Sequence, residues 1–405
     1  MDKIRFDTIS GMIIKWCVYA IIFAAPFSKS ISEASIAIAI TFWLVNKALN
    51  RNFRLERTDL NLPFAIFLIT VIPSLFVSNY HLLSLRAFFA KVLKFVLLYF
   101  VIVENMNTKS KLKDLFIIAL ISMIIIMTDG LVQYYGGCVD FLHKYPAFKY
   151  RLPDEGFFKG FPTASFPYPN DFAAWMLLTL TPLACVTMFS LKNKNIRYLT
   201  AFICFGLLYL FFLTKARGAW IALAVSVIYI ALSKKKIWLL ILIAAFIILP
   251  FIFRMEMAEY IFGFGSIGDR FSMWGTGWEI FKNHPLIGNG LNTFFLEFKE
   301  YRNDKWKGLK GSYAHNCYLQ MAADTGLVGL AGFVWLMLSY FFSVVKRLKD
   351  IKDEFYGPIL WGISIGAFAF LIHSFFDTNL YSLNLATLFW CAIGISGAIL
   401  KLKNE

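Results

Sequence analysis

Apolar runs long enough to cross a lipid bilayer recur along this chain from one end to the other. A transmembrane helix needs about 20 predominantly apolar residues. Twelve segments meet this requirement: 11–27, 34–49, 61–78, 84–103, 114–134, 171–190, 198–214, 218–233, 237–253, 315–345, 356–374 and 382–400. The tenth is too long for one straight crossing, so we expect it to begin outside the hydrocarbon. The pattern predicts an all-α polytopic membrane protein with about 12 transmembrane helices.

The composition supports this fold class. Hydrophobic residues make up 59% of the 405 residues and charged residues only 16%, whereas a soluble protein has roughly 45–50% and about 25%. The first apolar run is followed by further membrane-like sequence, which indicates a retained helix rather than a cleaved signal peptide. The six cysteines are scattered without a C-x-x-C pair, so we expect neither a disulfide framework nor a metal site.

The positive charges indicate how the chain is oriented in the membrane. A net charge of +15 would be compatible with nucleic-acid binding, but the basic residues stand in short clusters after the even-numbered spans. Such clusters mark cytoplasmic loops, so both termini are predicted to be cytoplasmic, with lipids rather than nucleic acid as partners. The clusters contain Lys47, Arg51, Arg54, Arg57, Lys109, Lys111, Lys113, Lys192, Lys194, Arg197, Lys234, Lys235, Lys236, Lys346, Arg347, Lys349, Lys352, Lys401 and Lys403.

The same topology divides the chain into five parts. Transmembrane helices are predicted in 1–134, 171–253 and 315–405, and two long outer loops in 135–170 and 254–314. Both loops carry lysine and arginine, but long loops translocate largely regardless of charge. Long loops that are not linkers usually carry function, so the outer face is where we expect a site.

Two segments of the outer face offer arginine. Arg217 lies in the short turn Thr214-Lys215-Ala216-Arg217-Gly218 between two spans. Its guanidinium could snorkel towards lipid phosphates or bind two oxygens of a substrate phosphate. Arg270 begins a predicted helix over 270–283, and His284 at its end has an expected structural or solvated role.

Two further polar residues lie at predicted span ends. His315 opens the tenth span; a lone histidine is more often packed in a core, but the partial positive charge of a helix start favours the neutral imidazole that a general base requires. Asp377 follows the eleventh span, where it could orient a base, hold an arginine or only hydrogen-bond within the bundle. Arg86, Lys91 and Lys94 in the fourth span are weaker candidates for substrate contact.

This set of side chains suits transfer from a diphosphate-activated donor. Arginines would bind the diphosphate and stabilise charge on the leaving group, and the histidine would take the proton from an acceptor hydroxyl. The sequence contains no carboxylate cluster that suggests a divalent metal, and no cofactor is expected.

The sequence resembles the superfamily of O-antigen ligases and polymerases over about the C-terminal 60% of the chain. The strongest match is His315-Asn316 followed after nine residues by Gly326-Leu327-Val328-Gly329, a histidine–glycine motif typical of O-antigen ligases. The supporting matches are Lys215-Ala216-Arg217-Gly218, Arg270 with Trp274, His284-Pro285-Leu286-Ile287-Gly288-Asn289-Gly290, and Phe166-Pro167-Tyr168-Pro169-Asn170-Asp171.

The resemblance implies a metal-independent glycosyltransferase of the C-type membrane class, with twelve helices and a large periplasmic loop, in the bacterial inner membrane. By this analogy Arg217 and Arg270 bind the undecaprenyl diphosphate of the donor glycan, His315 activates the acceptor hydroxyl, and Lys215, Asp377 and Arg86 support them.

The alternative functions differ in the acceptor that receives the glycan. A ligase transfers the glycan to a lipid A-core oligosaccharide, and the histidine–glycine motif and span count favour this reading. A polymerase uses a second lipid-linked repeat unit. A protein-directed oligosaccharyltransferase is disfavoured because such enzymes usually carry additional C-terminal sequence. A transporter or flippase would also have many spans, but it often shows inverted repeats, and none is evident here.

Overall fold

The computed structural model describes residues 3–136, 161–190, 193–233, 265–302 and 312–402, and these residues are helical without β-strands. The helices are α1 (Lys3–Ala24), α2 (Lys29–Leu49), α3 (Asn61–Val77), α4 (His81–Ala87), α5 (Lys94–Asn105), α6 (Lys109–Tyr135), α7 (Pro169–Phe189), α8 (Lys194–Leu213), α9 (Arg217–Ser233), α12 (Gly265–Asn283), α13 (Phe294–Tyr301), α14 (Cys317–Leu348), α15 (Tyr356–His373) and α16 (Leu383–Lys401). A π-helical segment, Phe88–Leu93, joins α4 to α5, and a 3₁₀ turn, Asn379–Tyr381, precedes α16.

The predicted class is confirmed: this is a multi-pass, all-helical membrane protein. Eight of the described helices are long and apolar enough to cross a membrane, and α3 and α9 are shorter apolar helices. The predicted span 84–103 corresponds to α4, the π-helical segment and α5 in one continuous helical run. The predicted span 237–253 lies outside the described residues, as do residues 137–160 of the first predicted outer loop and residues 254–264 and 303–311 of the second. The count of twelve therefore stays a prediction.

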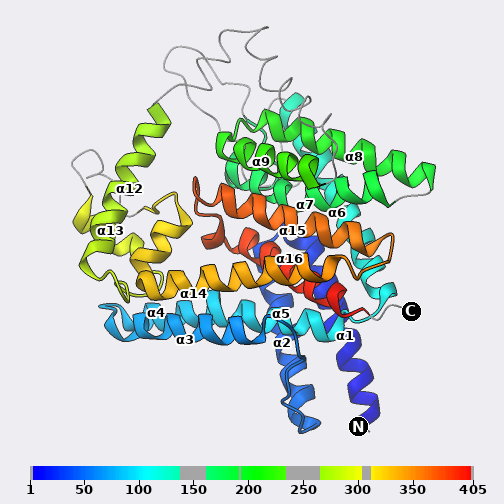
Figure 1. Cartoon of the computed structure of the whole chain (residues 1–405), viewed down its shortest axis with the longest axis horizontal. Coiled ribbons are helices and arrows are strands. Elements are labelled where there is room, and N and C mark those ends of the chain that lie inside the picture. The colour runs from blue at the N-terminus through cyan, green and yellow to red at the C-terminus, as the bar shows by residue number, and fades with distance from the viewer. Residues whose placement is uncertain (1–2, 137–160, 191–192, 234–264, 303–311, 403–405) are drawn as a thin grey trace.

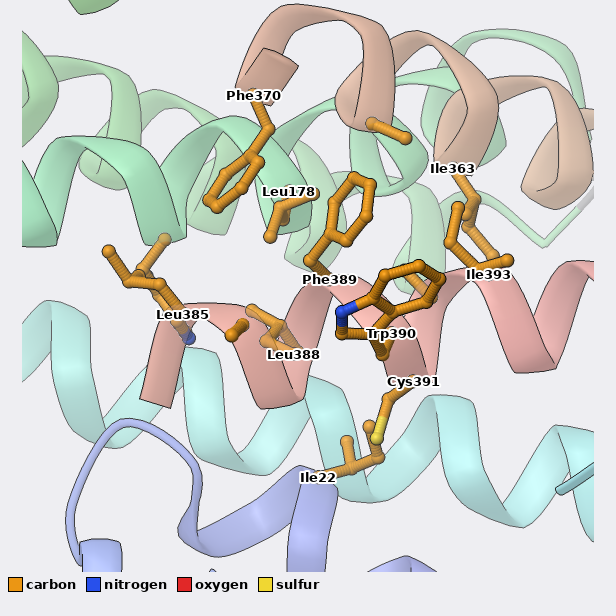
Figure 2. Close-up of a cluster of buried hydrophobic side chains, with 14 of the residues drawn as sticks. Ile22, Leu178, Ile363, Phe370, Leu385, Leu388, Phe389, Trp390, Cys391 and Ile393 are labelled. Carbon is orange, nitrogen blue, oxygen red and sulfur yellow. The ribbon is translucent and has the colours of Figure 1, made fainter. Parts of the chain in front are cut away.

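The helix bundle is built around α16. In Figure 1, α3, α14 and α15 run nearly parallel, and α12 and α13 lie at the end where α14 begins. Nearly all side chains of α16 are buried, as expected of a helix that is apolar all round. Figure 2 shows Phe370 of α15 and Leu178 of α7 pointing towards Phe389 of α16, and the Phe370 and Phe389 rings stack with centroids 5.2 Å apart.

Small residues let the core helices approach closely, as they do in other membrane bundles. On α15, a Cβ atom at Gly362 or Gly366 would overlap Pro182 or Thr181 of α7. The close crossing of α7 and α15 matters for the site, because it fixes the start of α7 beside the end of α15.

The two ends of the bundle differ in charge pairing. At one end, the basic residues of the predicted cytoplasmic loops pair with acidic residues: Lys47 with Glu104 at 2.9 Å, Lys109 with Asp353 at 3.3 Å, Arg347 with Asp59 at 2.5 Å, and Lys401 with Glu56. At the other end, α7, α9, α14 and α16 begin and α8 and α15 end. We call this second end the site end.

Candidate functional site

His315 is held just before the start of α14. The next residue, Asn316, caps this helix by accepting hydrogen bonds from the backbone N–H groups of Tyr318 and Leu319, both at 3.0 Å. His315 itself adopts a left-handed backbone conformation with φ 49°, uncommon for a residue with a side chain. Its carbonyl accepts a hydrogen bond from Trp274 Nε1 at 3.4 Å. The unusual conformation is therefore fixed from both sides, by the cap of α14 and by a side chain of α12.

Asp377 meets His315 from the turn after α15. His315 Nδ1 lies 3.2 Å from Asp377 Oδ1. The same carboxylate accepts hydrogen bonds from Asn170 Nδ2 at 2.7 Å and from the backbone N–H of Thr378 at 2.8 Å. Burial alone would raise the pKa of Asp377, but the hydrogen bond to His315 and the electrostatic interactions with His315, His373 and Arg270 lower it below its ordinary value. Asp377 is thus an ionised group that can orient the imidazole.

Asn170 and Asp171 bring the first turn of α7 into the site. Pro169 occupies the start of this helix, where its missing N–H has no partner to lose. Asn170 then holds Asp377, and Asp171 lies close enough to interact electrostatically with Asp377, His315 and Lys29. A second carboxylate therefore lies beside the His315–Asp377 pair.

Arg270 and Arg217 reach the same end from two other helices. Arg270 is partly buried on α12, and its charge acts on Asp377 and on the buried His373. Arg217 is the first residue of α9, and the next residue, Gly218, lies against His373 and Phe376, where a Cβ atom would come within 3.1 Å of His373 Cδ2. Arg217 therefore lies next to a residue that contacts the turn carrying Asp377, and Arg270 lies within electrostatic range of Asp377.

The helix start at Arg217 adds a second favourable element for an anion. The first backbone N–H groups of a helix lack intrahelical partners and carry partial positive charge, so phosphates commonly bind there. Lys215 precedes this helix, with its ammonium 5.0 Å from the centroid of the Phe161 ring. Burial lowers the pKa of Lys215. The start of α9 is therefore a position that favours an anion.

His373 is a buried histidine that joins this constellation. Its Nδ1 lies 2.9 Å from Asn379 Nδ2, and only 1% of the residue is exposed. The amide N–H of Asn379 is a donor, so Nδ1 is the acceptor and the neutral ring is the form that this contact fits. His373 therefore packs behind Asp377 rather than facing a substrate.

The histidine–glycine motif has a structural basis at its second half. Gly326 adopts a left-handed φ of 67° within α14, which breaks the helix. The loop after α12 lies across this break: Asn289 and Gly290 donate backbone hydrogen bonds to Ala323 and Asp324, and Leu327 donates to Pro285 at 2.8 Å. The motif therefore links His315 to the segment that follows α12.

The weaker candidates lie elsewhere. Arg86 is exposed on α4 and, within the described residues, shares no hydrogen bond or ion pair with His315 or Asp377. Lys94 pairs with Glu33 of α2 at 2.7 Å, and Lys91 contacts Asn292 at 2.6 Å. His284 is exposed after α12, which agrees with the structural or solvated role expected for it. Across the described ranges, no three His, Cys, Asp or Glu side chains gather as they would around a metal ion.

The structure brings to the site three side chains that were not among its expected residues: Asn170, Asp171 and His373. Asn170 and Asp171 had been noted only as part of the matching segment 166–171. Asn170 and Asp171 follow a proline at the start of a span on the predicted outer face, and this polar pair beside a helix start was a usable signal. His373 offered only its place in a long apolar run, which does not distinguish a packed histidine from a functional one.

Comparison with known proteins agrees with the resemblance. Residues 199–334 match the family model described as O-Antigen ligase; this region contains Arg217, Arg270, His315 and Gly326. A curated relative, Exopolysaccharide production protein ExoQ of Rhizobium meliloti (strain 1021), is 26% identical over 111 residues, or 26% of this chain. The aligned part covers 25% of that relative's length.

Proposed function

We propose that this chain, whose residues 199–334 match the family model described as O-Antigen ligase, transfers a glycan from undecaprenyl diphosphate to an acceptor hydroxyl at the periplasmic face of the inner membrane. The observation that carries this proposal is the contact between His315 and the ionised Asp377, at the end of the bundle where Arg217 and Arg270 also lie. This arrangement supplies a base, an orienting acid and two fixed cations.

In the proposed mechanism, Asp377 accepts the Nδ1–H of His315, so that Nε2 carries the lone pair and faces the acceptor. As the acceptor oxygen bonds to the anomeric carbon of the donor glycan, His315 Nε2 takes the hydroxyl proton. The bond between that carbon and the diphosphate oxygen breaks, and undecaprenyl diphosphate leaves with the bonding electrons. Asp377 balances the charge of the protonated ring, as an acid does beside a catalytic histidine in other enzymes.

Arg217 and Arg270 bind the diphosphate in this proposal and stabilise the charge that it gains on departure. Fixed donors aimed at developing charge are worth far more in a site that excludes water than in solution. No step requires a metal ion, because guanidinium groups and the start of α9 supply the positive charge.

Two acceptors remain in the proposal. The histidine–glycine motif favours a ligase that uses a lipid A-core oligosaccharide. The printed name of the relative, which concerns exopolysaccharide production, favours the alternative, a polymerase that extends a lipid-linked repeat unit. Both reactions use the same donor chemistry and the same base.

The test is a transfer assay with purified protein in liposomes that contain undecaprenyl-diphosphate-linked glycan, with and without lipid A-core. Glycan on the core indicates a ligase, and a ladder of longer lipid-linked glycans without core indicates a polymerase. His315→Ala should lose activity by about 10²–10⁴-fold, the usual contribution of a general base. His284→Ala is the matched control, because His284 is an exposed histidine outside the site. If correctly folded protein leaves both substrates unchanged, the transferase proposal is refuted and the transporter becomes the favoured alternative.

A further inference from the structure

The part of the chain that carries Arg270 and His315 forms a small unit with its own core. Apolar side chains of α12, α13 and the first half of α14 pack together, apart from the main core: Ile280, Phe281, Phe294, Phe298, Ala314, Ala322 and Ala323. We call residues 265–302 and 312–325 the outer unit. Two candidate site residues therefore belong to one body, while Arg217 and Asp377 belong to the main bundle.

The outer unit continues into the rest of α14 at a break. Gly326 has a φ of 67° and lies where a Cβ atom would overlap the backbone of Leu286. Backbone hydrogen bonds join the outer unit to the bundle on both sides of the break, from Leu327 to Pro285 and from Cys317 to Ser374, each at 2.8 Å. Because the helix is interrupted, side-chain contacts also help to set how the outer unit sits on the bundle.

One such contact comes from Lys91 on the π-helical segment Phe88–Leu93. Its ammonium donates to Asn292 Oδ1 at 2.6 Å, which is in the loop between α12 and α13. It also lies 5.7 Å from the ring centroid of Tyr381, in the turn before α16. A π-helical segment within a span is frequently found at functional positions, and this one presents a cation to the outer unit.

A second polar group between the two bodies is Asp324, which lies two residues before the break in α14 and is 1% exposed. Its Oδ2 accepts a hydrogen bond from the Tyr381 hydroxyl at 3.2 Å, and its Oδ1 accepts one from the backbone N–H of Phe294 at 3.0 Å. The charges of Lys91 and Asp324 also act on each other. Lys91 therefore contacts both Asn292 and Tyr381, and Tyr381 in turn donates a hydrogen bond to Asp324.

We propose that Lys91 and Asp324, connected through Asn292 and Tyr381, form a latch that fixes the outer unit against the bundle and so positions Arg270 and His315 relative to Arg217 and Asp377. These are positioning residues, because they act through the site side chains and not on the substrate. The role in transfer rests on the proposed function, whereas the mechanical role of the latch does not.

The first test is hydrogen–deuterium exchange of the full-length protein without substrate. Lys91→Met removes the cation and should raise exchange in peptides from 265–302 and 312–325 by about fivefold or more, through local opening, with little change in α7, α15 and α16. Lys94→Met is the matched control, since Lys94 lies three residues further along the same helical run and pairs with Glu33 of α2 instead. Equal exchange of the outer unit in both variants would overturn the proposal.

Two further variants make the result specific. The double variant Lys91→Met with Asp324→Asn should exchange no faster than the faster single variant, because coupled residues act non-additively; additive effects would contradict the latch. If Lys91→Met does not fold, Tyr381→Phe removes only the hydroxyl that binds Asp324, and the same local rise in exchange is expected from it.

The transfer assay gives the second readout. In Lys91→Met, displacement of Arg270 and His315 should lower kcat by about tenfold or more, since small displacements of reacting groups are costly. The KM for the acceptor should stay within about threefold of the wild-type value. If even the wild-type protein transfers no glycan, the proposed function fails, but the exchange measurement still decides on the latch. If the outer unit of Lys91→Met exchanges at the wild-type rate, the latch is refuted, and this result leaves the proposed transfer reaction untouched.

Discussion

At the scale of single residues, Asp377 has the most demanding set of contacts. Both of its oxygens are used: one by His315 and the backbone of Thr378, the other by Asn170. Three elements of the chain therefore converge on one carboxylate, namely the starts of α7 and α14 and the turn after α15. A carboxylate that accepts several hydrogen bonds and faces positive charges stays ionised, which suits an orienting group.

Replacing Asp377 with Asn should change how stability depends on pH. Burial raises the pKa of Asp377, but the hydrogen bond to His315 and the electrostatic interactions with His315, His373 and Arg270 lower it overall. An acid whose pKa falls on folding stabilises the protein above its unfolded pKa of about 4, and this contribution is lost as the pH falls further. In detergent, the Tm difference between wild type and Asp377→Asn should be largest above about pH 5 and should shrink below about pH 4. A constant difference would contradict the assignment.

Arg217→Ala and Arg270→Ala should each lower transfer by about 10²–10³-fold, the usual effect of losing one group that stabilises developing charge. Both proteins should reach the membrane in normal amounts, because each change removes a partly buried side chain at a helix start or on α12. Lys282→Ala, on the same helix as Arg270 and in a surface ion pair with Glu279, serves as the control. Wild-type turnover in either arginine variant would remove that arginine from the diphosphate site.

At the scale of elements, the glycine-containing loop after α12 and the break in α14 form one interlocked contact. Gly288 and Gly326 both have left-handed φ values, 76° and 67°, and each lies where a Cβ atom would overlap the backbone of the other segment. Glycine is required here for two separate reasons, the backbone conformation and the close approach. The histidine–glycine motif thus combines His315, the proposed base, with Gly326, which is needed for backbone packing.

Gly326→Ala should therefore lower the thermal stability of the protein by several degrees. A left-handed conformation costs a residue with a side chain about 1–3 kcal/mol, and the overlap with Leu286 adds to this. Gly275→Ala on α12 is the control, because nothing lies within 4 Å of a Cβ atom there and alanine favours a helix by up to ~1 kcal/mol. Equal Tm values for the two variants would show that the break tolerates a side chain.

At the scale of the whole molecule, the two ends of the bundle have separate tasks. The end with Lys47, Lys109, Arg347 and Lys401 satisfies its basic residues by pairing them with nearby acids. At the site end, His315 contacts Asp377, and Arg217 and Arg270 are carried by α9 and α12, which are far apart in the sequence. Figure 1 shows where these two helices lie. This separation is consistent with a membrane enzyme whose chemistry takes place at one face.

A labelling experiment tests which end faces the periplasm. Cysteine introduced at Glu279, exposed on α12, should react with a membrane-impermeant maleimide in cells whose outer membrane is permeabilised. Cysteine at Lys352, exposed at the opposite end, should react only after the inner membrane is opened. Wild-type protein is labelled in parallel to subtract its native cysteines. The reverse pattern would invert the proposed orientation and exclude a periplasmic site.

The sequence by itself determined the class of fold, because a run of about 20 apolar residues can satisfy its backbone in lipid only as a helix. It also determined the candidates His315, Arg217 and Arg270, because they lie on the predicted outer face, away from the basic clusters of the predicted cytoplasmic loops, and within the matched motifs. The left-handed backbone of His315 and the break at Gly326 were not visible in this way, as they arise from contacts between distant segments.

Only the tertiary structure decided which polar residues meet. Asn170 and His315 are brought to Asp377 across 207 and 62 residues of sequence, and Lys91 reaches Asn292 across 201. Hydropathy reports each helix's preference for lipid or protein, but it carries no information about which helices are neighbours. That choice follows from side-chain packing, such as the contact of Gly362 and Gly366 with α7, which brings the start of α7 to the end of α15.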